Sequence, residues 1–208
     1  MSLSNWMTEE LTGSAVYVPG TDIDTDQIIP GRFVYRPRDE GKFGNHLFYD
    51  QRFTLDGNII EEHPLNDPTF AGATILIADE NFACGSARTQ AVWAVQDYGV
   101  KVVIAPSFGA VFKSNAVRLG LAPLVVTQED VCELRSIVQS VPEEMITVDF
   151  RSRRISTGVG WSTGFVLSDL NLRRLLTGVD DLTITEAYKA DLEAFETQYI
   201  DRMPWLFG

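Results

Sequence analysis

The sequence has little of the residue types that build disulfides and metal sites. Of its 208 residues only two are cysteine, Cys84 and Cys132, and only two are histidine, His46 and His63. Two cysteines exclude a disulfide scaffold and a four-thiolate zinc site, and they fall short of the thiolates that an iron-sulfur cluster requires. We therefore predict that this chain binds no metal and no cofactor by itself.

Basic residues and long apolar runs are also scarce. There are 17 Lys and Arg against 29 Asp and Glu, which gives a formal net charge of -12. That sign opposes binding to nucleic acid and to anionic membranes. The most apolar runs, such as residues 73–78, fall far short of the roughly 18 to 20 residues of a membrane span, and no basic leader opens the chain. We expect a cytoplasmic protein without nucleic-acid or membrane partners.

The sequence does contain enough apolar material for one full core. Hydrophobic residues make up 45% of the chain and aromatic residues 11%. A chain of this length is at the upper edge of the usual size of one domain, and it has no internal repeat or low-complexity linker. We predict a single domain over residues 1–208, in which residues 1–12 form an irregular or flexible extension.

A strand, helix, strand pattern in the middle of the chain predicts a parallel sheet. Residues 73–79 and 100–105 are continuous apolar runs typical of buried strands, and the helix between them covers 86–98. Residues 31–68 have no regular period and predict a long irregular excursion. The other predicted elements are helices over 108–119, 128–139, 169–176 and 185–202 and strands over 13–17, 122–126, 146–150, 154–156 and 164–167. Together they predict a three-layer α/β fold.

The best candidate site follows the first apolar run and reads Asp79-Glu80-Asn81-Phe82-Ala83-Cys84-Gly85-Ser86-Ala87-Arg88. Ligands bind parallel sheets beyond the carboxyl ends of the strands. Gly85 allows close backbone approach, and the free N–H groups of a helix start would hold a carboxylate. Ser86 fits an N-cap or a catalytic group, and position alone favours the cap. Arg88 fits a surface ion pair or a guanidinium fork on a substrate carboxylate.

Three other features are less specific. The alternating acids of residues 22–26 resemble calcium ligands, but the segment lacks the Gly and Glu of an EF-hand loop, so hydrogen bonds that form turns explain it better. Arginines in residues 32–38 fit either a solvated surface or an anion-recognition loop. Cys84 has no neighbouring base in the sequence, so it is interpreted as a small, partly buried residue.

Four motifs occur in order along the chain: Asp24-Thr25-Asp26-Gln27-Ile28-Ile29-Pro30, Phe43-Gly44-Asn45-His46-Leu47-Phe48, Asn81-Phe82-Ala83-Cys84-Gly85-Ser86-Ala87-Arg88 and Val102-Val103-Ile104-Ala105-Pro106-Ser107-Phe108. In this order and spacing they resemble the small subunit of 3-isopropylmalate dehydratase, a member of the aconitase superfamily. The similarity continues into the tail and covers nearly the whole chain.

The resemblance implies a swivelling β/β/α domain of the aconitase C-terminal type. Such a domain docks on a separate large subunit, as a heterodimer or heterotetramer, and the large subunit carries a 4Fe-4S cluster. The assembled hydro-lyase isomerises 2-isopropylmalate and 3-isopropylmalate, small dicarboxylates of leucine biosynthesis, by dehydration and rehydration. This chain alone would then be inactive.

The resemblance also implies roles for individual residues. The family's base falls on Ser86, and the arginine that holds a substrate carboxylate falls on Arg88, beside Gly85. A second substrate arginine is expected in the loop that follows the first motif, with Arg38 as first choice and Arg36 as second. Thr25 and Asp26 are expected to support the site as a loop.

The sequence departs from the family pattern directly after Arg88. The family usually reads Ser-Ser-Arg-Glu-His, whereas this chain has Thr89 and Gln90 in the last two places. The departure leaves two alternatives open: a small subunit for a related alkylmalate, of citraconate or dimethylmalate type, or a non-catalytic binding paralogue. A hydrolase acting alone through Ser86 or Cys84 is disfavoured because no Gly-x-Ser-x-Gly elbow is present.

Overall fold

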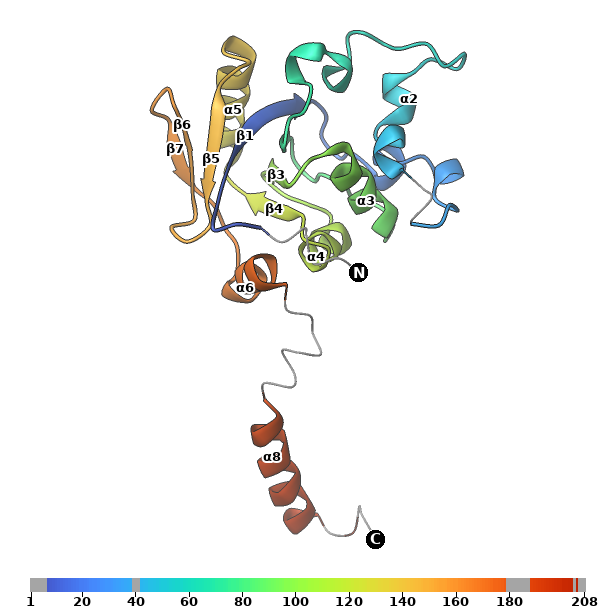
Figure 1. The fold of residues 1–208 in the computed structure, drawn as a ribbon. Helices are drawn as coiled ribbons and strands as arrows, with labels where there is room; N and C mark the ends of the chain where they lie inside the picture. Colours follow the sequence, from blue (N-terminus) through green and yellow to red (C-terminus); the bar gives the residue numbers. More distant parts are fainter. Residues whose placement is uncertain (1–6, 39–41, 179–187, 204, 206–208) are drawn as a thin grey trace.

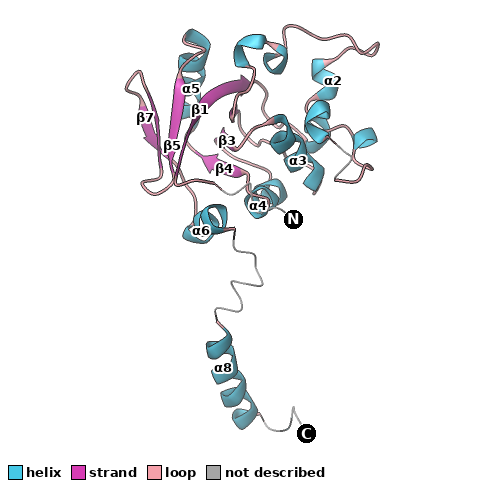
Figure 2. Cartoon of the chain, in the orientation of Figure 1, coloured by secondary structure: helices cyan, strands magenta, loops and turns pink. Residues whose placement is uncertain are grey.

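The computed structural model describes residues 7–38, 42–178, 188–203 and 205. Its central element is one curled sheet of seven strands, which is drawn in Figure 2. The strand order is β4-β3-β2-β1-β5-β6-β7. The strands are β1 (Glu10–Val18), β2 (Ile75–Ala78), β3 (Val102–Ala105), β4 (Ala122–Val125), β5 (Met145–Asp149), β6 (Arg154–Thr157) and β7 (Ser162–Gly164). The sequence-based α/β fold class is confirmed.

The parallel half of the sheet comprises β1 to β4. Every residue of β2 and β3 is buried, which explains why their sequences are continuously apolar rather than alternating. Helices α3 (Thr89–Tyr98) and α4 (Ala110–Arg118) follow β2 and β3, and α5 (Gln128–Ser140) follows β4. Parallel strands place their carboxyl ends at one edge of the sheet, which positions the loops described below.

The antiparallel half folds over the parallel half. Strand β5 pairs with β1, and β6 and β7 continue outward from it. The chain after β7 returns to the far edge, where the Val166 N–H donates to the Val125 carbonyl at 2.8 Å. Helix α6 (Asp169–Thr177) then packs near α4, and α8 (Lys189–Arg202) extends away from the sheet in Figure 1.

Two hydrophobic clusters fill the space on the two faces of the parallel strands. One cluster joins one face to α3, α4 and the excursion of residues 31–68. The other joins the opposite face to α5 and to the inward residues of β5 and β6. The layers are therefore helix, sheet and folded-over sheet, with α5 packed among the second cluster.

The excursion consists of short helical turns, as the lack of a regular period predicted. Its elements, with the turn that precedes them, are α1 (Thr25–Ile28), η1 (Gly31–Phe33), η2 (Phe43–His46), α2 (Tyr49–Arg52), η3 (Pro64–Asn66) and η4 (Pro68–Phe70). Side chains cap several of them: the Asp67 carboxylate accepts the Thr69 N–H at 2.8 Å, and His63 Nδ1 accepts the Leu65 N–H at 3.1 Å. Local caps thus replace long helical hydrogen-bond ladders.

Several element boundaries differ from prediction. Strand β1 begins at Glu10, so the irregular extension over residues 1–12 is wrong for 10–12, which pair with β5; residues 1–6 lie outside the described part. Strand β7 covers 162–164 rather than 164–167. Helix α8 begins at Lys189, and the predicted residues 185–187 also lie outside the described part. The single-domain assignment stays a prediction.

None of the helices in the described ranges is long and apolar enough to cross a membrane.

Candidate active site

Three loops meet at the carboxyl ends of β1, β2 and β3, and the middle loop carries the Gly85-Ser86-Ala87-Arg88 motif. On one side the Cys84 N–H donates to the Ile23 carbonyl and the Thr25 N–H to the Cys84 carbonyl, both at 3.0 Å. On the other side the Phe82 N–H donates to the Ser107 carbonyl at 3.0 Å. The motif loop is therefore bonded along both edges, as an additional strand would be.

The motif loop has an unusual backbone. Asn81, Ala83 and Gly85 have positive φ values of 58°, 59° and 86°. The left-handed conformation costs a non-glycine residue roughly 1–2 kcal/mol, so the first two persist because their neighbours hold them. Gly109 permits this arrangement, because any Cβ at that position would overlap the Ala83 carbonyl. The strain is concentrated in the residues that lead into Ser86.

Ser86 lies exposed after these turns and does not cap a helix. The N-cap of α3 is Arg88, and no side chain caps that helix, so the predicted helix start at Ser86 and its capping role are wrong. The Ser86 carbonyl accepts the Arg88 N–H at 2.9 Å and the Thr25 hydroxyl at 3.3 Å. Thr25 is 1% exposed, so a buried hydroxyl anchors the backbone of an exposed serine.

Arg88 forms an ion pair with Asp26, between Nη1 and Oδ1. The Arg88 side chain is 25% exposed and that of Asp26 is 54% exposed. Gly31 lies beside the pair, since a Cβ at that position would stand 3.6 Å from each of the two paired atoms. An incoming carboxylate would therefore meet a guanidinium that already has a partner in water-accessible surroundings.

Gln90 connects the first turn of α3 to the arginine-bearing segment of residues 32–38. Its Nε2 donates to the Val34 carbonyl at 3.3 Å. An amide N–H is an adequate substitute for an imidazole N–H in such a contact, but it cannot carry a titrating proton. The departure from the family pattern at this position is thus compatible with an ordered loop.

The surroundings of Cys84 disfavour its thiolate form. Burial first, and then the charges of Asp24 and Asp22, raise the pKa of its thiol. Its Sγ donates to the Asp22 carbonyl at 3.3 Å. The geometry agrees with the interpretation of Cys84 as a partly buried structural residue.

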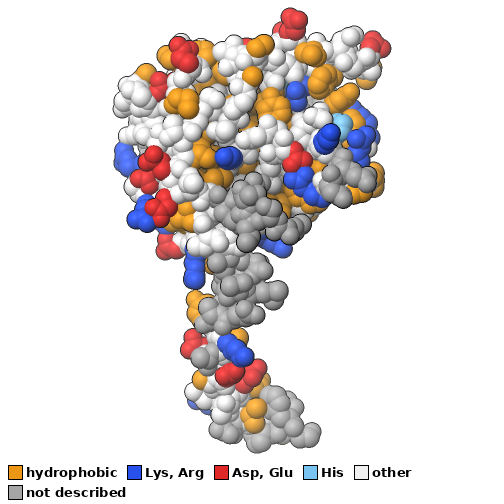
Figure 3. Space-filling model, viewed as in Figure 1, with side chains coloured by type: hydrophobic (Ala, Val, Ile, Leu, Met, Phe, Trp, Pro, Cys, Tyr) orange, Lys and Arg blue, Asp and Glu red, His pale blue; other side chains and the backbone are white. Residues whose placement is uncertain are grey.

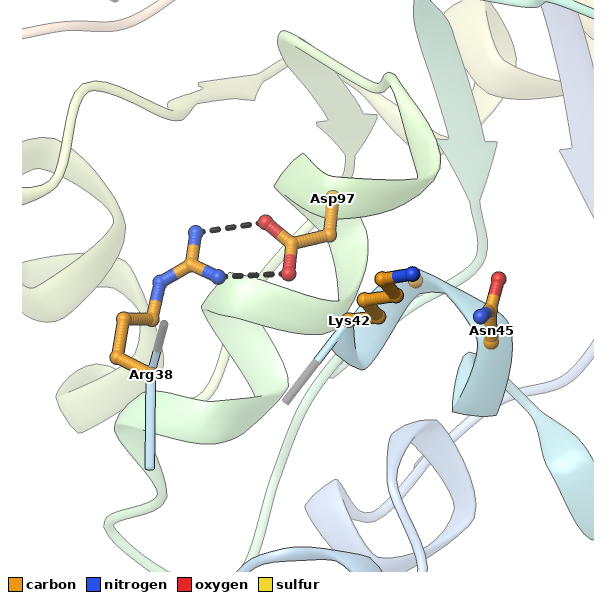
Figure 4. Close-up of a pocket in the computed structure, with 5 residues that line it drawn as sticks. Arg38, Lys42, Asn45 and Asp97 are labelled. Atoms are coloured by element: carbon orange, nitrogen blue, oxygen red, sulfur yellow. Dashed lines mark hydrogen bonds and ion pairs between the residues drawn. The ribbon is translucent and has the colours of Figure 1, made fainter. Parts of the chain in front are cut away.

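Arg38, the first-choice substrate arginine, lies at the opposite end of α3 from Arg88. Its guanidinium binds Asp97 with two hydrogen bonds of 2.6 Å, as Figure 4 shows. Arg88 and Asp97 are nine residues apart on α3, which is about 13 Å along the helix. A pocket of about 370 Å³ lies here, and Lys42, Gly44 and Asn45 also line it. The structure therefore does not bring Arg38 to Ser86.

Arg36, the second choice, is exposed and forms no ion pair with a described residue. It lies close enough to His46 that its charge, after burial, lowers the pKa of that imidazole. His46 stacks on Phe33 with ring centroids 4.0 Å apart, and Phe33 ends the turn that begins at Gly31. Arg36 therefore belongs to the segment that passes Arg88.

Asp24 is a site residue that sequence reasoning did not assign. Its carboxylate accepts the Asp26 N–H at 2.7 Å, and its own N–H donates to Gln27 Oε1 at 2.7 Å. This is a capping box at the start of α1. The spacing of Asp24 and Gln27 is the signal that could have identified it.

The chain's own residues do not fit an iron-sulfur cluster. Cys84 lies in the motif loop, whereas Cys132 lies exposed on α5. Within the ranges that the structure describes, no three His, Cys, Asp or Glu side chains gather where they could hold a metal ion. A cluster needs more thiolates than two.

The sequence matches the aconitase C-terminal domain family over residues 6–129. A solved structure of 3-isopropylmalate dehydratase from Methanocaldococcus jannaschii shares the fold, with a TM-score of 0.59 and 23% identity over 89% of this chain and 98% of that one. Fold and sequence together define the class, a swivelling domain of the aconitase superfamily. The predicted aconitase-type fold is confirmed.

Curated relatives narrow the class. The 3-isopropylmalate dehydratase small subunit of Geobacillus kaustophilus is 41% identical over 190 residues, which is 91% of this chain and 95% of the relative. The small subunit of Shewanella putrefaciens is 39% identical over 189 residues, 90% of this chain and 94% of the relative. The chain belongs to the family of 3-isopropylmalate dehydratase small subunits.

Proposed function

We propose that this chain is the small subunit of a cytoplasmic hydro-lyase that interconverts 2-isopropylmalate and 3-isopropylmalate in leucine biosynthesis. The observation that carries the proposal is the exposed Ser86 in a strained loop beside Arg88. The similarity to small subunits along nearly the whole chain supports it.

Each motif residue has a role in this proposal. The Ser86 oxygen takes the proton from the substrate carbon during dehydration and returns a proton during rehydration. Arg88 binds a substrate carboxylate, exchanging the Asp26 carboxylate for that of the ligand. Its positive charge also stabilises the serine oxygen when it is deprotonated. Thr25 holds the Ser86 backbone, and Asp26 holds Arg88 until substrate arrives.

A large subunit completes the site in this proposal. Gly85, Ser86 and Ala87 are all exposed in the isolated chain, so the motif needs a second surface to exclude water from the reaction. An iron-sulfur cluster on that subunit would supply the Lewis acid that removes the substrate hydroxyl. The assembly in this proposal is a heterodimer or a heterotetramer.

Arg36 is the better candidate for the second substrate arginine. Arg38 is held by Asp97 at the far end of α3, whereas Arg36 belongs to the exposed segment that passes Arg88. Arg36 has no acidic partner among the described residues, and a guanidinium of this kind costs less to recruit to a dicarboxylate.

Thr89 and Gln90 favour testing a second substrate class, a smaller alkylmalate of citraconate or dimethylmalate type. The bond from Gln90 to the Val34 carbonyl fixes a segment that passes Arg88. A change of residue there can alter the alkyl pocket while Ser86 and Arg88 keep their roles.

The deciding experiment reconstitutes the chain with its cognate large subunit under anaerobic conditions and measures turnover of a panel of alkylmalates. We expect turnover of isopropylmalate by the complex and none by the isolated chain. Turnover of only a smaller malate would replace the substrate assignment. A complex that forms, binds a full cluster and turns over nothing would leave the non-catalytic paralogue.

A further inference from the structure

The Asp24 carboxylate lies directly against Gly85, the residue before Ser86. A Cβ at residue 85 would stand 2.7 Å from the carboxylate carbon of Asp24 and would overlap its Oδ2. Gly85 has a φ of 86°, which a residue with a side chain rarely adopts. The space that a side chain would take at residue 85 is therefore occupied by Asp24.

Asp24 is itself held in place. Its Oδ1 accepts the Asp26 N–H, and its backbone N–H is bound by the Gln27 side chain. The backbone on either side of Asp24 pairs with Cys84 as a parallel bridge. The carboxylate thus has a fixed position relative to both loops.

The residues on either side of this contact lead to the reacting groups. After Asp24 come Thr25, whose hydroxyl binds the Ser86 carbonyl, and Asp26, which pairs with Arg88. After Gly85 comes Ser86. One carboxylate therefore supports both the backbone that presents Ser86 and the turn that holds Arg88.

We propose that Asp24 is a positioning residue for Ser86, acting through its shape and its helix cap against Gly85. The inference rests on the proposed function, because it assigns a role in presenting the same serine. Asp24 does not touch the reacting atoms in this role. Its carboxylate acts as a wedge that fixes the Gly85 backbone, and an amide of the same shape serves equally well.

The chain offers a matched control in Asp67. It too is an N-cap of a short helical turn and accepts the N–H two residues on, at 2.8 Å compared with 2.7 Å for Asp24. It caps η4, in the excursion rather than in the three loops of the site. Replacing either residue removes one cap, but only the Asp24 change also removes the contact with Gly85.

The first experiment compares Asp24→Ala, Asp24→Asn and Asp67→Ala in the reconstituted complex. We expect Asp24→Ala to lower kcat by about 10- to 100-fold with little change in KM, because a misplacement of about 1 Å has an effect of this size. Asp24→Asn keeps kcat within about threefold, since Asn caps helices as well as Asp. Asp67→Ala keeps kcat and lowers Tm as much as Asp24→Ala does. An unchanged kcat in Asp24→Ala, or an equal loss in Asp24→Asn, would overturn the proposal.

A double-mutant cycle tests the contact itself. Gly85→Ala should reduce kcat about 100-fold in the wild-type background. In the Asp24→Ala background the same change should cost about tenfold, because the overlap is gone while the strain of a positive φ remains in both. Independent, multiplying effects would contradict the proposed wedge.

A third measurement needs no catalysis, so it separates this proposal from the assignment of function. Amide hydrogen exchange of the full chain should become faster for the peptide that contains residues 85–88 in Asp24→Ala and stay unchanged in Asp24→Asn and Asp67→Ala. Protection that stays unchanged in Asp24→Ala would refute the wedge even if the wild-type complex is active. An inactive wild-type complex with this exchange pattern would refute the assigned activity and leave the positioning role standing.

Discussion

The two ends of α3 each carry an arginine paired with an aspartate, yet the pairs differ in construction. At the amino end, Arg88 and Asp26 make a single contact, and more than half of the Asp26 side chain is exposed. At the carboxyl end, Arg38 and Asp97 make two parallel hydrogen bonds, and Asp97 also accepts the Phe43 N–H at 3.1 Å. We therefore expect the first pair to exchange its acid for a substrate carboxylate and the second pair to remain intact.

The surroundings of the two pairs reinforce this difference. The Arg38 guanidinium lies over the Trp93 ring, 5.3 Å from its centroid, and Gly44 packs against the backbone of Asp97 where a Cβ would not fit. At the other end Arg88 has Gly31 beside it, which leaves room around the guanidinium. The two arginines do not differ in this direction by their own burial, since the Arg38 side chain is 38% exposed and that of Arg88 25%. The burial of the paired aspartate and the number of contacts distinguish the two pairs.

The largest effect is expected from Ser86→Ala, near the amino end of α3. Removing a general base lowers kcat by about 10² to 10⁴-fold, and the exposed side chain predicts an unchanged Tm. Steady-state turnover of the reconstituted complex and a thermal melt measure the two quantities. Ser152→Ala, an exposed serine in the turn after β5, is the control for kcat and should leave it unchanged, whereas its Tm should fall slightly because the Ser152 side chain hydrogen-bonds the Asp149 carboxylate. Activity close to wild type in Ser86→Ala would remove Ser86 from the mechanism.

Arg88→Gln should have the next largest effect. Loss of a charge-assisted contact with a carboxylate is worth about 1.5–3 kcal/mol, which corresponds to a fall in kcat/KM of about 10- to 100-fold. The rise in KM should account for much of the fall in kcat/KM.

Asp26→Asn tests the proposed exchange of carboxylates directly. It frees Arg88 from a competing acid, so KM should fall or stay level. A raised KM in Asp26→Asn would mean that Asp26 itself binds substrate.

Acidic pH should destabilise the structure around the carboxyl end of α3, away from the candidate site. Burial, and then the charge of Arg52, lowers the pKa of His63 from 6.5 to about 4. The unfolded chain therefore binds an extra proton between these pH values, so this stabilisation is complete above pH 6.5 and is lost as pH falls toward 4. Its full size is on the order of 3 kcal/mol. The loss reaches α3 because the Leu65 N–H binds His63 and the Leu65 carbonyl accepts the Tyr98 hydroxyl at 2.7 Å.

Urea unfolding at pH 7.5 and at pH 5 measures the contribution of His63 to the free energy of unfolding. His63→Asn keeps an N-cap without a titrating ring, so its free energy of unfolding should change less between the two pH values than that of the wild type. If the free energy of unfolding changes by the same amount between the two pH values in both proteins, His63 does not contribute to the pH dependence of stability.

The smallest effect is expected from Arg38→Ala. The loss of two partly exposed charge-assisted bonds should lower the free energy of unfolding by about 1 kcal/mol and change kcat/KM by less than about threefold. Arg32→Ala is the control: Arg32 and Asp50 are each more than half exposed, so its loss should be smaller still. A large rise in KM in Arg38→Ala would restore Arg38 as a substrate arginine and break the contrast between the two ends of α3. Arg36→Ala should show that rise instead.

Sequence reasoning predicted the elements with a local signature. The continuous apolar runs of β2 and β3 predicted two buried parallel strands, and the Gly85-Ser86-Ala87-Arg88 motif placed the candidate site beyond them. It could not predict the pairing of Arg38 with Asp97, because the two residues are 59 positions apart and nothing near either one signals the other.

The start of α3 was missed for a related reason. Ser86 is a good capping residue, so local propensity favoured a helix from there. The structure places the helix start at Thr89 because the residues before it are bonded to the loops on both sides, which holds Asn81 and Ala83 in a conformation that propensity disfavours. Local rules fail most often where neighbouring segments impose the backbone.

The return of the chain to β4 also affects how readily the isolated chain aggregates. An open edge strand offers unpaired carbonyl and N–H groups to any passing chain and is a common starting point of aggregation. The bond from the Val166 N–H to the Val125 carbonyl occupies the last position of that edge from within the chain. The chain thereby closes one end of this edge to the strands of other molecules.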